Sequence, residues 1–394
     1  MPPRIVLVTG LGGAGRSTAA AATAVAAARS GARTVLVTEK GPAPCDDVPG
    51  LTITRVDGGH AFRARAHAFQ ARLGSVLDLL GAEPLDAEEF TELPGARSFA
   101  LLHALGEAAA GRADTVVADL PPLPQAVTLL ALPEQLRRYL ARLLPPERQA
   151  ARALRPVLAQ LAGVPMPAQW LYEAAARWDV ELAAVQGLVE SAATTVRLVV
   201  EPGPHAAERL RDARTGLALF GHRVECVLAN RILPTGSADP FLAGLSGGQQ
   251  EHLKALNDEF GTGRTSGTEV CELPHLGHAP HGADDLAALG VPAPAPVPDG
   301  RGPAARPWSV EDRLGTEGHL LWRLPLPGTT RDRLDLVRRG DELVVDAASF
   351  RRIIPLTSAL RRCTVSGAAL RDGALLVRFT PDPELWPADR APKP

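Results

Sequence analysis

Residues 4–18 read RIVLVTGLGGAGRST, and this stretch decides the fold of the first half of the chain. It begins with a continuous apolar run, 5–8, of the kind found in buried parallel strands. A glycine cluster follows, and an alanine-rich segment with high helix propensity comes directly after it. Glycines let successive backbone N–H groups turn toward an anion, and a helix N-terminus adds positive potential there. The stretch therefore predicts a strand, a phosphate-binding loop and a helix.

Buried-strand runs of the same type recur along the chain, separated by segments of helical period. They lie at 33–38, 51–56, 115–119, 196–201, 223–229 and 268–273. This alternation predicts an α/β domain over residues 1–292, with a doubly wound, mostly parallel sheet. The Leu/Ala-rich text at 134–192 predicts a helical insert in that domain. Its apolar stripes are expected to be core, and a client-binding groove is the alternative.

The pattern changes beyond the first domain. Residues 293–312 contain a proline-rich run that predicts an extended linker. Apolar residues then alternate with period two, and Asp372-Gly373 is a strong hairpin signal. We expect a small all-β sandwich at 313–381 and a disordered tail at 382–394.

Composition excludes several classes of protein. The 394 residues are 45% hydrophobic and 22% charged, with a formal net charge of −2. This is ordinary globular usage, and no global field would draw the chain to nucleic acid or anionic lipid. No apolar stretch is long enough for an integral membrane segment, and the start lacks a signal-peptide core. The 4 cysteines are scattered without a C-x-x-C pair, which favours a reducing cytoplasm.

The chain resembles the ArsA-like deviant P-loop ATPases, the arsenite-pump and tail-anchored-protein-targeting family, whose loop reads G-K-G-G-V-G-K-T-T. The text at 116–122 and 128–134 is similar to that family's second switch. Further similar segments occur in family order at 93–95, 194–202, 217–224, 227–234 and 273–276. The C-terminal sandwich resembles the α-crystallin-like (small heat-shock protein) domain attached to some members, through the text at 324–328, 340–345 and 367–377.

The resemblance implies ATP/ADP and Mg²⁺ as cofactors and assigns the site residues. The phosphates would contact Gly12, Gly13, Ala14, Gly15, Arg16, Ser17 and Thr18. Mg²⁺ would be held by Ser17 and Asp119, and the adenine would contact Asn230 and Pro274. Two of these residues have other interpretations: Asp119 as a capping or turn residue, and Asn230 as the start of a turn.

The sequence departs from the family pattern at residues expected to act on the phosphates. Arg16 replaces the loop lysine, and Leu11 replaces the signature lysine that reaches the partner subunit's nucleotide. Arginine keeps the positive charge, but its guanidinium is bulkier than an ammonium group, and leucine has no charge. Glu39 follows the second strand and could position the attacking water, or be a solvated strand-end residue. We therefore predict weak hydrolysis.

The resemblance also implies partners: a homodimer or a heterodimer with an ArsA-like paralogue, and a hydrophobic protein client. The leading hypothesis is a weak ATPase that acts as a conformational switch in the cytoplasm. A catalytically inactive scaffold or chaperone-like binding protein is the alternative. A partitioning ATPase is disfavoured because the sequence has no basic arm or amphipathic anchor, and we expect no nucleic-acid partner.

Overall fold

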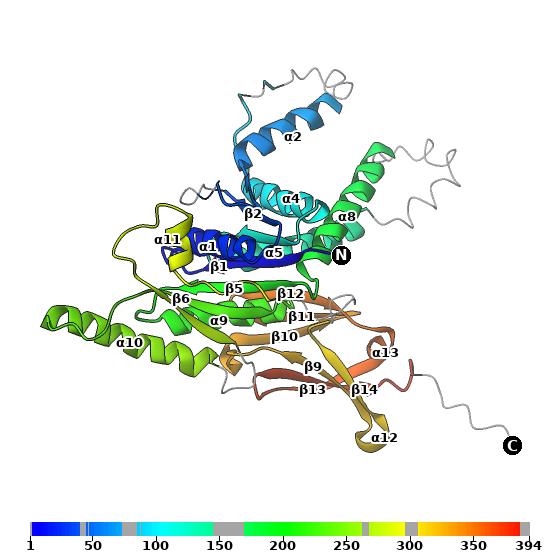
Figure 1. The fold of residues 1–394 in the computed structure, drawn as a ribbon. Coiled ribbons are helices and arrows are strands. Elements are labelled where there is room, and N and C mark those ends of the chain that lie inside the picture. Colours follow the sequence, from blue (N-terminus) through cyan, green and yellow to red (C-terminus); the bar gives the residue numbers. More distant parts are fainter. Residues whose placement is uncertain are drawn as a thin grey trace. The chain divides into compact units, whose positions relative to one another are not determined.

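The computed structural model describes residues 2–39, 45, 47–72, 85–86, 88–144, 169–261, 268–295 and 306–386. The chain divides into two compact units. The first comprises 1–9, 15–194 and 276–303, and the second comprises 10–14, 195–275 and 304–394. Seven strands form one sheet in the order β3-β2-β4-β1-β5-β6-β7, and the neighbouring strands of this sheet that belong to the same unit are parallel. Figure 1 labels β1 and β2 of the first unit and β5 and β6 of the second. The predicted α/β fold with a mostly parallel sheet is confirmed.

The first unit contains one half of this sheet. Its strands are β1 (Arg4–Gly10), β2 (Thr34–Thr38), β3 (Leu51–Arg55) and β4 (Thr115–Asp119). Its helices are α1 (Arg16–Arg29), α2 (Gly58–Arg72), α4 (Ala96–Ala110), α5 (Gln125–Leu143), α8 (Gln169–Val189) and α11 (Ala283–Ala288). The helix α1 packs on α11 and on the strands β2 and β4, whereas α8 packs on α4 and α5.

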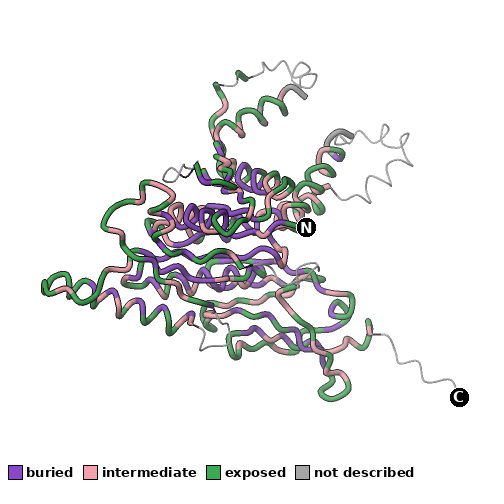
Figure 2. The backbone as a smooth tube through the Cα atoms, viewed as in Figure 1, coloured by how far each residue is buried: buried purple, intermediate pink, exposed green. Residues whose placement is uncertain are grey.

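Burial of β1 and β4 explains their apolar sequences. Residues 5–10 and 115–119 are buried throughout (Figure 2). The helix α1 ends at Arg29, and Gly31 follows with φ 94°, a left-handed conformation that favours glycine. Gly31 therefore marks the end of this helix.

The second unit contains β5 (Thr194–Val200), β6 (Val224–Ile232) and β7 (Glu269–Pro274), with β7 at the sheet edge. Its helices α9 (Ala206–Leu219) and α10 (Pro240–Phe260) pack against each other, and α10 also contacts β6 and β7. Asp239 caps α10 by accepting hydrogen bonds from the backbone N–H groups of Phe241 and Leu242.

The C-terminal sandwich lies in the same unit. A three-stranded sheet contains β10 (Leu334–Arg339), β11 (Glu342–Ala347) and β12 (Phe350–Pro355). A four-stranded sheet has the order β13-β14-β9-β8, formed by β13 (Cys363–Arg371), β14 (Ala374–Pro381), β9 (His319–Pro325) and β8 (Ser309–Arg313). Strands β13 and β14 pair antiparallel around Asp372-Gly373, as predicted. Trp322 and Phe379 are fully buried in its core.

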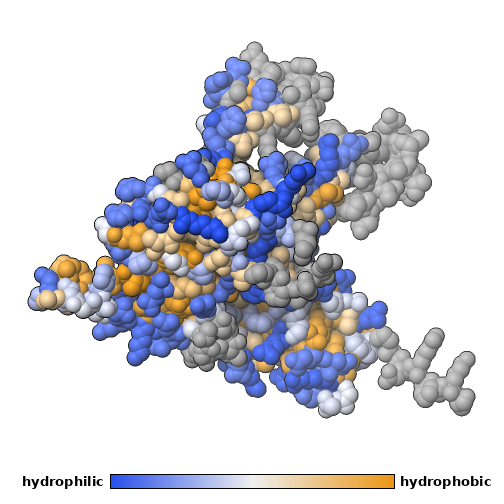
Figure 3. All heavy atoms as spheres, viewed as in Figure 1, coloured by the Kyte–Doolittle hydropathy of each residue, from blue (hydrophilic) through white to orange (hydrophobic). Residues whose placement is uncertain are grey.

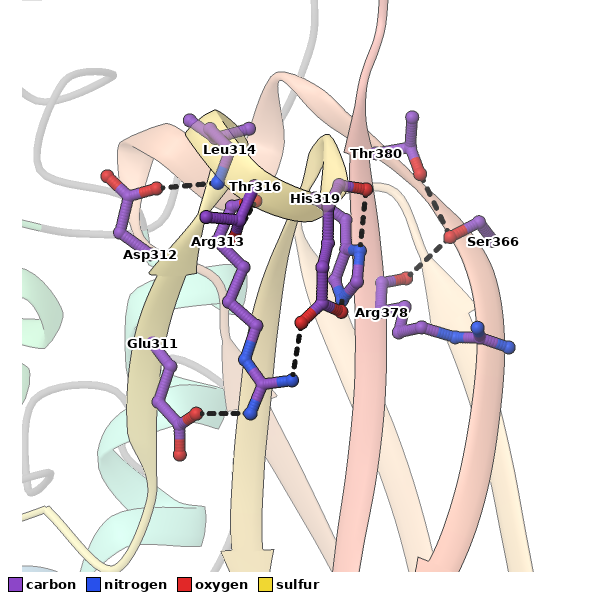
Figure 4. Close-up of polar contacts among 10 residues, drawn as sticks. Glu311, Asp312, Arg313, Leu314, Thr316, His319, Ser366, Arg378 and Thr380 are labelled. Carbon is purple, nitrogen blue, oxygen red and sulfur yellow. Dashed lines mark hydrogen bonds and ion pairs between the residues drawn. The ribbon is translucent and has the colours of Figure 1, made fainter.

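A short helix, α12 (Leu314–Glu317), connects β8 to β9, and polar contacts hold it (Figure 4). The Asp312 carboxylate accepts from the Leu314 backbone N–H. The Arg313 guanidinium pairs with Glu311 and Glu317 at 2.9 and 3.1 Å. On the neighbouring hairpin, the Thr380 hydroxyl donates to Ser366. These contacts are structural and bring no catalytic group together.

The sandwich is docked on α9 within this unit. A Cβ at Gly216 would lie 2.5 Å from the Phe350 ring, so glycine permits close packing there. The Arg352 guanidinium donates to the Leu219 carbonyl at 2.8 Å and lies over the Phe220 ring. Arg333 pairs with Asp212 on α9 through two hydrogen bonds. The β-sandwich is therefore fixed to the α/β half of its unit.

Replacing Arg352 by alanine is expected to destabilise the second unit by about 2–3 kcal/mol, because the residue is only 6% exposed. The change removes the hydrogen bond to Leu219 and the stacking on Phe220 and Trp308. Urea unfolding measures the effect. The matched control is the exposed Arg371 of the same sandwich, whose alanine variant should change stability by less than about 0.5 kcal/mol. Equal effects at both positions would contradict the docking.

Some predicted segments fall outside the described residues. Residues 145–168 of the predicted insert, 296–305 of the predicted linker and 387–394 of the predicted tail are among them. Within the described part of the chain, no helix is long and apolar enough to cross a membrane.

Candidate functional site

The loop between β1 and α1 has the backbone geometry of an anion site. Gly13 has φ 82° and Gly15 has φ 86°, so both adopt the left-handed conformation. Gly15 is the N-cap of α1, and no side chain caps the helix there. The first N–H groups of a helix lack intrahelical partners. Gly12 and Gly13 are exposed, and a Cβ on either would meet nothing within 4 Å, so space is open above the loop.

In the second unit, the start of this loop is tied to β5 and β6. A Cβ at Gly10 would lie 1.9 Å from the Val199 carbonyl oxygen, so only glycine fits there. The Leu11 backbone N–H donates to that same carbonyl at 3.1 Å. The Asn230 side chain, 6% exposed, donates through Nδ2 to the Ala14 carbonyl at 2.8 Å. Asn230 therefore braces the loop with its donor, while its Oδ1 can still accept.

The backbone around Asn230 is irregular. The β6–β7 register shifts between Ala229 and Ile232, and Arg231 has φ 60°. The His275 backbone N–H donates to the Ile232 carbonyl, which places Pro274 at the exposed end of β7. The two residues predicted to contact adenine thus lie at the carboxyl ends of neighbouring strands of one unit: Asn230 comes just before Ile232, which ends β6, and Pro274 ends β7.

In the first unit, Asp119 lies at the carboxyl end of β4 and is 8% exposed. The Thr38 hydroxyl, at the end of the adjacent β2, donates to Asp119 Oδ2 at 3.0 Å. Oδ1 is buried and has no hydrogen-bond partner among the described residues. Burial raises the pKa of Asp119, and hydrogen bonds from Ser17 and Thr38 and the charge of Arg16 oppose this rise.

Arg16 does not extend freely from the loop. Its Nη1 donates to the Leu120 carbonyl and lies 3.9 Å from Asp119 Oδ1. The Leu120 backbone N–H donates to the Val8 carbonyl at 2.9 Å, and Thr9 Oγ1 donates to the Pro121 carbonyl. The start of the predicted second switch is therefore fastened both to β1 and to Arg16.

Glu39 directly follows Thr38 and is exposed. Its charge acts on Arg97 of α4, which also pairs with Glu92 at 2.8 Å. Residues 40–44, which follow Glu39 in the chain, lie outside the described residues. The structure thus puts Glu39 at a strand end in the first unit, and both of its predicted interpretations stay open.

The residues present fit Mg²⁺ and a phosphate. Mg²⁺ takes oxygen ligands and keeps several waters, and a buried carboxylate oxygen without a partner is a suitable donor. Asp119 Oδ1 has no hydrogen-bond partner among the described residues, and the Ser17 hydroxyl is near the same carboxylate. Open space above Gly12 and Gly13 fits an anion. When bound, the ion would neutralise charge on the phosphates.

Other polar groups do not form a metal site. The His278 and His281 rings stack at 5.7 Å, and His278 pairs with Asp285. No group of three or more candidate metal ligands occurs among the residues that the structure describes. His275, His278 and His281 thus form no metal-ligand group in the described part of the chain.

Sequence reasoning missed Thr38 as a partner of Asp119. The two residues are far apart in the chain and meet only because β2 neighbours β4 in the sheet. A polar residue at the end of a buried strand was the available signal, since functional groups gather at the carboxyl ends of parallel strands.

Comparisons with known proteins identify the family of the chain. The family described as "Anion-transporting ATPase" matches residues 3–290, and the "HSP20-like domain found in ArsA" matches 317–379. A Streptomyces coelicolor protein is 54% identical over 98% of this chain and 100% of its own length. A Mycobacterium tuberculosis protein is 32% identical over 98% of this chain and 97% of its own length.

A protein of Aquifex aeolicus, named as a candidate arsenical pump-driving ATPase, is 23% identical over 95% of this chain and 99% of its own length. The glycine loop and the aspartate at the end of β4 fall within the first matched segment, and most of the C-terminal sandwich falls within the second. The chain therefore belongs to the anion-transporting ATPase family, in the form that carries an ArsA-type HSP20-like domain.

Proposed function

We propose that this protein binds ATP and ADP with Mg²⁺ and hydrolyses ATP slowly, as a cytoplasmic conformational switch for a hydrophobic or protein client. The observation that carries the proposal is Asp119 Oδ1, which is buried and has no hydrogen-bond partner among the described residues. It lies beside Ser17, which follows the left-handed glycines of the loop. A buried carboxylate oxygen without a partner is costly, and a bound cation would remove that cost.

Each residue has a proposed role. The backbone N–H groups of residues 12–18 and the Arg16 side chain would bind phosphates. Ser17 and Asp119 would hold Mg²⁺, and Thr38 would keep the Asp119 carboxylate in place. Glu39 would position the attacking water, and Asn230 with Pro274 would contact adenine.

Slow hydrolysis follows from the missing ammonium groups. Leu11 offers no charge, and Arg16 is held by the Leu120 carbonyl and by Asp119. Loss of a cation that opposes developing phosphoryl charge typically costs several powers of ten in rate. Arginine at 16 is also a poor geometric substitute for lysine.

Exposed apolar side chains support the proposed partners. In the first unit, Tyr139, Leu143, Trp178 and Val180 of α5 and α8 are 53–77% exposed, which suits a hydrophobic client. In the second unit, the first turns of α10 expose Phe241, Leu242 and Leu245 (Figure 3). This exposed apolar end of α10 suits association with a second copy of the chain or with a paralogue.

The alternative is an inactive scaffold, and one observation favours it. The bond from Arg16 to the Leu120 carbonyl already gives Asp119 a nearby counter-charge without any metal. A chain stabilised in this way could keep its fold and bind partners without turnover. The two functions differ in whether nucleotide binds and whether phosphate is released.

A thermal-shift titration with ATP and ADP, with and without Mg²⁺, tests the proposal. We expect a Mg²⁺-dependent rise in Tm, since ligand at a hundredfold excess over Kd adds about 2.7 kcal/mol. Phosphate release from the same sample should be slow but measurable, and slower still in Glu39→Gln, which should keep the shift. No shift at millimolar nucleotide would refute the proposal. A shift without phosphate release would select the scaffold.

A further inference from the structure

The Arg16 guanidinium contacts two groups at the carboxyl end of β4. Its Nη1 donates to the Leu120 carbonyl, and the same nitrogen lies 3.9 Å from Asp119 Oδ1. All three residues belong to the first unit. The Arg16 side chain is 20% exposed and the Asp119 side chain 8%, so this charge pair is largely withdrawn from solvent. A side chain from the start of α1 therefore places a positive charge beside the buried carboxylate.

The contact between Arg16 and Asp119 is an ion pair that leaves an oxygen unused. A separation of 3.9 Å is too long for a hydrogen bond, and Asp119 Oδ1 has no hydrogen-bond partner among the described residues. The other oxygen, Oδ2, accepts from the Thr38 hydroxyl at 3.0 Å. The guanidinium thus offsets part of the negative charge, but a cation bound directly to Oδ1 would interact more strongly.

Arg16 can leave this position without detaching the segment that follows β4. The Leu120 backbone N–H donates to the Val8 carbonyl at 2.9 Å, and Thr9 Oγ1 donates to the Pro121 carbonyl at 2.7 Å. Both bonds come from β1 and do not involve Arg16. Departure of the guanidinium would therefore release the Leu120 carbonyl and keep the rest of the segment attached to the sheet.

We propose that Arg16 is an autoinhibitory residue, whose guanidinium in the nucleotide-free protein blocks the position beside Asp119 Oδ1 that Mg²⁺ would take. This inference rests on the proposed function, because it concerns the regulation of the same site. Two cations at one carboxylate oxygen repel each other, so the guanidinium and a bound Mg²⁺ exclude one another there. Phosphate oxygens would offer the guanidinium other partners when it turns away from Leu120.

This blocking contact lowers the affinity of the empty site for Mg²⁺. A site that is open in about one molecule in ten has an apparent affinity about tenfold below its intrinsic value. A phosphate that draws Arg16 away would remove this penalty, and Mg²⁺ would in turn favour phosphate binding by the same factor. Arg16 would thereby couple the two halves of the Mg²⁺–nucleotide ligand before any hydrolysis occurs.

The experiment titrates the full-length, nucleotide-free protein with Mg²⁺ alone in a calorimeter. Arg16→Gln should bind Mg²⁺ about tenfold more tightly than the parent, and adding Asp119→Asn to it should abolish the gain. The matched control is Arg33→Gln, because Arg33 pairs at 2.7 Å with Asp114, just before the other end of β4. This variant removes the same charge and should bind Mg²⁺ as the parent does. The inference is overturned if Arg16→Gln gains no affinity, or if Arg33→Gln gains as much.

Urea unfolding in the presence of EDTA gives a second measurement without any metal. Asp119→Asn should raise the urea midpoint more in the Arg16→Gln background than in the parent, because the carboxylate has then lost its nearby counter-charge. Equal shifts in the two backgrounds would also overturn the inference. The proposed function is judged separately, by the response of the parent to ATP with Mg²⁺. A parent that responds, beside an Arg16→Gln variant that gains no affinity for Mg²⁺, keeps the function and loses the autoinhibition.

Discussion

Lysine at positions 11 and 16 together is expected to raise the rate of ATP hydrolysis by roughly 10²–10³-fold over the parent. The double variant Leu11→Lys with Arg16→Lys restores both ammonium groups of the family loop. The gain should appear in kcat, because a cation that opposes charge developing on the phosphoryl group acts in the transition state. Phosphate release under saturating ATP and Mg²⁺ measures it.

The geometry of Arg16 gives the reason for changing both positions. In the parent, its Nη1 donates to the Leu120 carbonyl and lies 3.9 Å from Asp119 Oδ1. The guanidinium is thus directed at the end of β4. A lysine has a compact, flexible ammonium that can point to the phosphates instead. Leu11 is half-buried in a loop anchored to Val199, so a lysine there should not disturb the fold.

Single variants and an arginine control sharpen the result. Arg16→Lys alone should give part of the gain in rate. The control variant Leu11→Arg, which keeps Arg16, should hydrolyse ATP more slowly than the double lysine variant. Unchanged urea unfolding would show that the fold is intact. If the double variant turns over no faster than the parent, the missing ammonium groups are not the limiting defect, and the explanation for slow hydrolysis fails.

Most of the fold could be predicted because its signals are local. Continuous apolar runs identified the parallel strands, and period-two alternation with Asp372-Gly373 identified the final hairpin. The glycine cluster identified the loop, and Gly13 and Gly15 indeed adopt the left-handed conformation. These features depend on neighbouring residues only, so the sequence contains them directly.

The contacts between distant residues could not be predicted. Thr38 meets Asp119 only because the strand order places β2 beside β4. The docking of the sandwich on α9 depends on Gly216 facing Phe350, which no local pattern signals. The direction of Arg16 likewise depends on where the Leu120 carbonyl lies.

The variant Asp119→Asn is expected to separate stability from metal binding. The protein without nucleotide should become more stable by roughly 1 kcal/mol at neutral pH, because the change removes a buried charge whose Oδ1 has no hydrogen-bond partner. The Thr38 hydroxyl can still donate to the side-chain oxygen of asparagine. The Mg²⁺-dependent rise in Tm with ATP should be lost, since an amide is a much poorer ligand for Mg²⁺ than a carboxylate.

The pH dependence of this stability gain has a definite sign. Burial raises the folded-state pKa of Asp119 above its unfolded value, so the folded protein binds the proton more tightly. Ionisation of Asp119 therefore costs stability as the pH rises through the interval between the two values. The advantage of Asp119→Asn should be full above the folded-state pKa and should shrink as the pH falls through it. Urea unfolding of the parent and the variant across this pH range measures the difference in their stability. The contributions of the other carboxyl groups are the same in both proteins and cancel in that difference.

Asp114 provides the matched control because it precedes the same strand and its pKa is shifted in the opposite direction. Hydrogen bonds from the Arg33 side chain and backbone hold the pKa of Asp114 well below its usual range. Asp114→Asn should therefore give no stability gain and should keep the Mg²⁺-dependent shift with ATP. If Asp119→Asn is destabilising at neutral pH, or keeps the Mg²⁺ effect, the carboxylate at the end of β4 is a structural group and not the metal ligand. In that case the inactive scaffold becomes the better account of the chain.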